Sequence, residues 1–198
     1  MKNKRFNRYL VVNDNILEYK ETNIQELLEK DGTVLADNPF TVTTSLLICR
    51  MAKSYNFNPA FLALILLCNT NHLKRKETHS AEEIASAIGF SPITSFEQKL
   101  DLISRLIYRM ILTRKHAHED KIVKVMDDKE FTVKNYATFV LYSMLPWIGR
   151  KNFRVYKREA DKEGNIIKVW SELDTKAPFG VYLFRQKCIK LGLEELLV

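Results

Sequence analysis

Cysteine is scarce in this sequence, and its three copies are widely spaced. Cys49, Cys68 and Cys188 each lie in an apolar stretch with helical periodicity, and no C-x-x-C pair occurs. A zinc site or a disulfide framework usually shows cysteines in close pairs or in larger number. We therefore expect three small buried side chains in a protein of a reducing compartment.

Long hydrophobic runs are missing as well. The longest apolar run, 59–68, has ten residues, about half of the ~20 that span a bilayer. The basic N-terminal sequence MKNKRFNR is followed by an apolar stretch that is too short for the core of a signal peptide. We therefore expect a cytoplasmic protein without a membrane partner.

The sequence also lacks the short motifs of nucleotide-binding and nucleophilic enzymes. It contains no G-x-x-x-x-G-K-[ST], no G-x-G-x-x-G and no G-x-S-x-G. His116 and His118 have the spacing of two metal ligands on a strand, but no third ligand accompanies them, and a polar hairpin turn explains the same residues. We predict a non-enzymatic protein without cofactor or metal, although dispersed catalytic residues would leave no such motif.

Positive charge is the main compositional feature. The chain has 31 Lys and Arg against 24 Asp and Glu, a net charge of +7, and 46% of its 198 residues are hydrophobic. The hydrophobic share predicts a packed core in one large or two small domains. The charge favours a polyanionic partner, nucleic acid or a membrane surface, although it also serves solubility alone.

Capping signals place several helices. Asn58 followed by Pro59 starts a helix that is apolar on all sides and should be buried. Capping boxes start a second helix at Ser80 and a third at Ser95, and Gly89 ends the second. An amphipathic helix over 135–148 and a last one over 179–190 are also expected.

Strands are predicted in three places. Residues 8–20 suggest two short strands around an Asn-Asp turn, and 113–117 alternate as if paired with 121–126. Residues 152–173 form the clearest hairpin pattern. The fold class expected from these elements is mainly α with small β-hairpins, α+β.

The middle of the chain resembles a winged helix-turn-helix domain. Over 59–126 the expected order is helix, connector, short helix, turn, long helix and hairpin, and EEIASAIGF is similar to the first half of a helix-turn-helix. The resemblance implies a recognition helix over 95–113 and a wing over 113–126. It predicts an arm over 1–40, a winged-helix-like domain over 41–133 and a hairpin-plus-helix part over 134–198.

Two features depart from that pattern. The turn 90–95 is longer than the tight version of the motif. The first turns of the recognition helix carry Glu97 and Asp101 where base-contacting residues normally lie, and carboxylates facing phosphates would be repelled. An ordinary helical hairpin explains the same two capped helices equally well.

Six basic residues form the predicted nucleic-acid site. They lie on one face of the long helix, at its end and along the proposed wing: Arg105, Arg109, Arg114, Lys115, Lys121 and Lys124. Together they could follow a phosphate backbone, or they could be a solvated face paired with the nearby acids. A second region, 147–190, combines eleven Lys and Arg with interleaved aromatics, which suit either single-strand stacking or a core.

Two functions are compatible with the sequence. The first is a non-enzymatic nucleic-acid-binding protein of transcription control, replication initiation or DNA packaging, and the Lys- and Asn-rich composition would suit a phage or plasmid. The second is a structural or adaptor protein of a larger assembly, such as a virion component, using protein partners or self-association. The fully apolar helix 59–68 and the two acids on the proposed recognition helix support the second.

Overall fold

The structure is a computed structural model of the chain. It describes residues 9–37, 40, 42–73, 75, 77–89, 95–116, 122–124, 130–149, 156–160, 166–170 and 179–198. Seven α-helices run through these ranges: α1 (Ile24–Asp31), α2 (Thr44–Ser54), α3 (Pro59–Asn69), α4 (Ala81–Ala87), α5 (Phe96–His116), α6 (Tyr136–Gly149) and α7 (Phe179–Leu191). Three short 3-10 helices accompany them: η1 (Asp14–Leu17), η2 (Val34–Asp37) and η4 (Glu194–Leu196).

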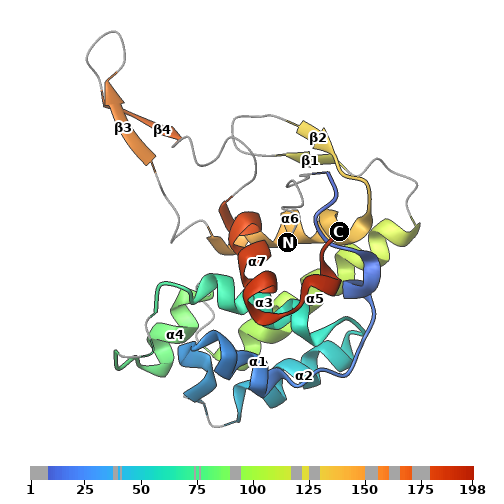
Figure 1. Cartoon of the computed structure of the whole chain (residues 1–198), viewed down its shortest axis with the longest axis vertical. Helices are drawn as coiled ribbons and strands as arrows, with labels where there is room; N and C mark the ends of the chain where they lie inside the picture. Colours follow the sequence, from blue (N-terminus) through green and yellow to red (C-terminus); the bar gives the residue numbers. More distant parts are fainter. Residues whose placement is uncertain are drawn as a thin grey trace.

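Helix α3 is the centre of the fold. The Asn58 side chain accepts a hydrogen bond from the amide of Ala60 at 2.9 Å, and Pro59 occupies the first turn, as the sequence predicts. Every residue of α3 is buried, and those from Ala60 to Asn69 are at most 3% exposed. Helices α1, α2, α6 and α7 pack against it (Figure 1). A helix that is apolar on all sides is stable only when neighbours surround it, and here the chain supplies them itself.

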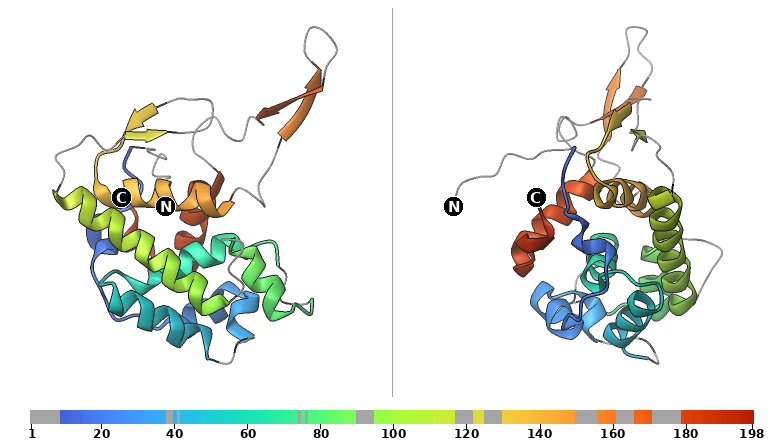
Figure 2. Two further views of the ribbon diagram at one scale, coloured as in Figure 1. Left: turned by 180° about the vertical axis from the view of Figure 1, so that it is seen from behind. Right: turned by 90° about the vertical axis from the view of Figure 1, so that its right-hand side faces the viewer.

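Helix α5 lies along one side of this bundle. Leu100, Ile103 and Ile107 are completely buried at the spacing of one helix face, and α5 packs on α2 and α6 (Figure 2). The opposite face of α5 is therefore left on the surface. No helix in the described ranges combines the length and the apolar composition needed to cross a membrane.

Helix α4 is held to α5 by a buried lysine. Ser80 accepts from the amide of Glu83 at 3.1 Å, so its predicted N-cap is confirmed, and Gly89 adopts a φ of 89°, which suits glycine after a helix C-terminus. Lys99, 3% exposed, donates to the carbonyl oxygens of Ala85 and Gly89, both at 2.6 Å. These contacts satisfy carbonyls that the end of α4 leaves without helical partners.

The two ends of the described chain meet beside α6. Val12 and Leu197 form an antiparallel bridge, and the amide of Val198 donates to the carbonyl of Val11 at 3.2 Å. The Thr138 hydroxyl accepts from the amides of Val11 and Val12, at 3.0 and 3.3 Å. The first turn of α6 therefore fixes the N-terminal segment, which in turn pairs with the C-terminal one. The strands predicted within 8–20 are wrong, because η1 forms there, with the Asn13 side chain accepting from the amide of Asn15.

A buried ion pair joins α1 to α7. Asp31 accepts from Lys187 Nζ at 2.8 and 3.0 Å, and from Lys190 Nζ at 3.2 Å. The side chains of Asp31 and Lys187 are 6% and 8% exposed. Because neither charge is well solvated, each depends on the other.

The α+β fold class predicted from the sequence is wrong. Helices make up most of the described residues, and the buried side chains that the structure describes lie in helices or between them, apart from Val11, Val12 and Val133. The described strands form two separate two-stranded ribbons and no layer of the core. They are β1 (Ile122–Lys124) with β2 (Glu130–Thr132), and β3 (Tyr156–Ala160) with β4 (Ile166–Trp170).

The predicted wing is also wrong. Residues 113–116 continue α5 as helix, so they cannot be the first strand of a hairpin, and β1 pairs with β2 instead. The β3–β4 ribbon falls within the predicted 152–173. The domain boundaries near residues 40 and 133 remain predictions.

Candidate nucleic-acid interface

The outer face of α5 carries the two arginines that the sequence singled out. The buried positions 100, 103, 107 and 111 turn Arg105 and Arg109 outward, and both are exposed. Tyr108 and Leu112, 37% and 39% exposed, share this surface. The spacing of the apolar residues was sufficient to place these side chains.

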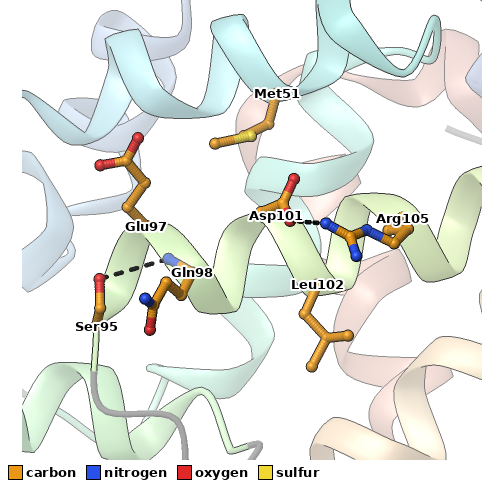
Figure 3. A pocket seen from close by; sticks show the side chains of 7 residues that line it. All are labelled: Met51, Ser95, Glu97, Gln98, Asp101, Leu102 and Arg105. Carbon is orange, nitrogen blue, oxygen red and sulfur yellow. Dashed lines mark hydrogen bonds and ion pairs between the residues drawn. The ribbon is translucent and has the colours of Figure 1, made fainter.

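The first turns of α5 lie beside α2, and their acids have partners there although the Glu97 side chain is exposed. Glu97 forms an ion pair with Arg50 of α2. The hydroxyl of Tyr55, which follows α2, donates to Asp101 Oδ1 at 2.6 Å. Figure 3 shows Glu97 and Asp101 pointing toward α2 and Leu102 pointing away from it. Both acids are therefore partnered within the protein. From the sequence, they were expected to face the phosphates of a bound duplex.

Arg105 belongs to the same network. Its guanidinium donates to Asp101 Oδ2 at 2.5 Å, one helical turn away. A hydrogen bond with the Tyr55 hydroxyl and the charge of Asp101 raise the pKa of Arg105 above its ordinary value. Asp101 balances the positive charge of Arg105, which leaves this residue a smaller part in attracting phosphate than the sequence suggested.

An open pocket of about 660 Å³ lies between Met51 of α2 and the first turns of α5. Its lining residues are Met51, Ser95, Glu97, Gln98, Asp101, Leu102 and Arg105 (Figure 3). The two acids are partnered by Arg50, Tyr55 and Arg105, and the pocket presents no cluster of unpaired charge.

Arg109 differs from Arg105. Among the described residues it has neither an ion pair nor a hydrogen bond, and it stands on the exposed side of α5. Arg114 and Lys115 follow in the last turn of the same helix and not on a strand. Lys124 is on β1, while Lys121 lies outside the described residues. Of the six predicted residues, four therefore lie on α5, and the structure describes Arg105 and Arg109 as exposed on one face of it.

A further cation lies nearby that the sequence analysis missed. Lys134 is exposed just after β2, and its amide donates to the carbonyl of Tyr9 at 2.8 Å. The C-terminal end of α5, the β1–β2 ribbon and the start of α6 lie at the same end of the molecule in both views of Figure 2. We call Arg109, Arg114, Lys115, Lys124 and Lys134 the basic end.

Metal ligands do not gather in the described ranges, where no group of three or more His, Cys, Asp and Glu side chains is placed to hold an ion. His116 is the last residue of α5, so the strand geometry considered for His116 and His118 does not apply. His118 lies outside the described residues.

Arg50 and Tyr55 were missed because no local pattern marks them. They reach α5 only through the packing of α2 on that helix.

No protein-family model matches the sequence, and no curated protein or solved structure matches it either.

Proposed function

We propose that this chain binds nucleic acid through the basic end, without catalysing a reaction. The observation that carries the proposal is the exposed Arg109, which lacks an acidic partner in the described residues and precedes Arg114 and Lys115 on the same helix. Cations that no protein carboxylate neutralises are the groups that release counterions when they bind phosphates.

The distribution of charge along the sequence favours nucleic-acid binding by the half that contains the basic end. Residues 1–98 contain eleven Lys and Arg against eleven Asp and Glu, whereas 99–198 contain twenty against thirteen. The whole net charge of +7 therefore belongs to the second half. Within this half, residues 99–134 include the basic end and contain nine Lys and Arg against six Asp and Glu, a surplus that attracts a polyanion.

The acids at the start of α5 have partners within the protein, so their charge does not argue against phosphate binding by this helix. Glu97 and Asp101 would repel phosphates if they faced them, but Arg50, Tyr55 and Arg105 hold them at the α2 side. The contact region of the proposal is therefore the C-terminal half of α5, one to four turns beyond the residues at which a recognition helix would read bases.

Charge reversal tests this function. Arg109→Glu should weaken binding of a labelled oligonucleotide, measured by fluorescence anisotropy, by about tenfold or more at low salt. Arg109→Gln should flatten the slope of log affinity against log salt by about 0.7 to 0.9. Lys20→Glu, at an exposed cation before α1 in the charge-neutral half, is the matched control and should change binding by less than the Arg109 variant. Equal effects of the two reversals would refute a localised interface.

Assembly through protein contacts is the second candidate. Tyr182 and Ile189 are 51% and 38% exposed and lie seven residues apart, on one face of α7. The buried α3, in contrast, no longer supports this function, since the chain covers it completely. Light scattering over a range of protein concentrations should show a constant monomer mass; a mass that rises, and returns to the monomer value in Tyr182→Ser, would favour assembly.

A further inference from the structure

Tyr108 is an exposed aromatic side chain between two arginines. It is 37% exposed on the outer face of α5, with Arg109 next to it and Arg105 one turn before it. Leu112, 39% exposed, lies one turn after it. A single exposed tyrosine is ordinary on a protein surface, and the groups around the ring decide what it can bind.

A chain of contacts holds the Tyr108 ring in place. Its centroid lies 5.8 Å from that of Tyr55, with 53° between the ring planes. The Tyr55 hydroxyl donates to Asp101 at 2.6 Å, and Asp101 is also bound by Arg105 at 2.5 Å. An aromatic side chain that is already positioned loses little conformational freedom when a ligand stacks on it.

The same contacts disfavour insertion of α5 into the major groove of a duplex. A recognition helix presents its N-terminal residues to the base edges. In α5 these turns lie against α2, where Arg50 binds Glu97 and Tyr55 binds Asp101. Stacking on an unpaired base makes a smaller demand, because it needs one exposed ring and a nearby cation.

We infer that this surface binds single-stranded nucleic acid, with an unpaired base stacked on Tyr108 and an adjoining phosphate bound by Arg109. The inference rests on the proposed function and narrows it to one class of ligand. Arg105 donates a hydrogen bond to Asp101, and because a guanidinium has five N–H groups, others remain for a ligand. Arg105 would therefore lie beside the stacked base as a hydrogen-bond donor that Asp101 holds in place and whose charge Asp101 balances. Stacking tolerates any base, so little sequence preference is expected.

The test compares three tyrosine variants in the full chain. Anisotropy titrations use one labelled single-stranded DNA oligonucleotide and the duplex formed with its complement, at several salt concentrations. Tyr108→Ala should raise the single-strand dissociation constant by roughly five- to a hundredfold, the range found for loss of one stacked base. Tyr108→Phe keeps the ring and should stay within about twofold of wild type, as should Tyr182→Ala, which removes an exposed tyrosine of α7.

The salt dependence separates stacking from charge. The slope of log affinity against log salt should be unchanged in both Tyr108 variants and flatter in Arg109→Gln by about 0.7, the contribution of one phosphate contact on a single strand. Thermal unfolding of each variant checks that the fold is intact, and Tyr108→Leu replaces Tyr108→Ala if that variant unfolds.

The outcomes distinguish base stacking on Tyr108 from nucleic-acid binding in general. If Tyr108→Ala binds as wild type does while Arg109→Glu does not, stacking is refuted and nucleic-acid binding stands. Tighter binding of the duplex than of the single strand also overturns the single-strand inference alone. If the wild-type protein binds neither form at low salt, the proposed function fails, and the inference fails with it.

Discussion

Replacing Asp31 with Asn should destabilise the fold more than an ordinary surface substitution does. Asp31 accepts from Lys187 at 2.8 and 3.0 Å, and the side chains of Asp31 and Lys187 are 6% and 8% exposed. Removing one partner of such a pair leaves the other charge buried, which costs about 3–5 kcal/mol. Two effects reduce this cost. The Asn oxygen still accepts one hydrogen bond. A carboxylate at the C-terminus of α1 interacts unfavourably with the helix dipole, so its removal returns about 0.5 kcal/mol.

We therefore expect Asp31→Asn to lower the free energy of unfolding by about 3 kcal/mol. Urea denaturation followed by circular dichroism gives this value. Lys190→Gln is the matched control, because Lys190 contacts the same carboxylate at 3.2 Å with a side chain that is 54% exposed, so its loss should cost about 1 kcal/mol or less. The double variant Asp31→Leu with Lys187→Met should recover most of the loss, since apolar pairs often replace buried ion pairs without penalty. If Asp31→Asn costs no more than Lys190→Gln, the pair does not join α1 to α7 as argued.

Two further predictions concern the core. Thr138→Val removes the hydroxyl that accepts from the amides of Val11 and Val12, and should cost about 1–3 kcal/mol in the same urea assay, against less than about 0.5 kcal/mol for the exposed Thr132→Val. Burial raises the pKa of Cys68 to about 12, against the opposing charge of Lys187, and burial likewise raises the pKa of Cys188. A thiol reagent should therefore modify Cys49 before the other two, which should react only on unfolding, and the reverse order would contradict their burial. Because the folded thiol pKa values exceed the unfolded ones, this contribution to stability is complete below pH 9 and is lost as pH rises toward 12.

Capping residues and apolar spacing predicted where the helices form, but not which helices pack together. The caps at Asn58 and Ser80 and the buried α3 followed from short sequence patterns, since a cap and an apolar helix are properties of neighbouring residues. The end of α5 was taken for a strand because its polar residues 113–116 carry no apolar spacing that would show the helix to continue.

The candidate site was predictable only in part. The exposure of Arg105 and Arg109 followed from the apolar face of α5. The pairing of Glu97 with Arg50 and of Asp101 with Tyr55 did not, because these partners are more than 40 residues apart and meet only when α2 packs on α5. This packing decides which acids have partners within the protein and which arginine, Arg109, has no acidic partner among the described residues. Propensity and capping carry no information about it.

If the C-terminal half of α5 contacts nucleic acid, photo-crosslinking locates that contact directly. A single-stranded oligonucleotide with iododeoxyuridine is irradiated with the wild-type chain, and tryptic peptides are identified by mass spectrometry. The label is expected on the peptide 106–109, which contains Tyr108, and it should be lost in Tyr108→Ala. A label confined to peptides outside 106–134, such as 177–185 with the exposed Tyr182, would contradict the account.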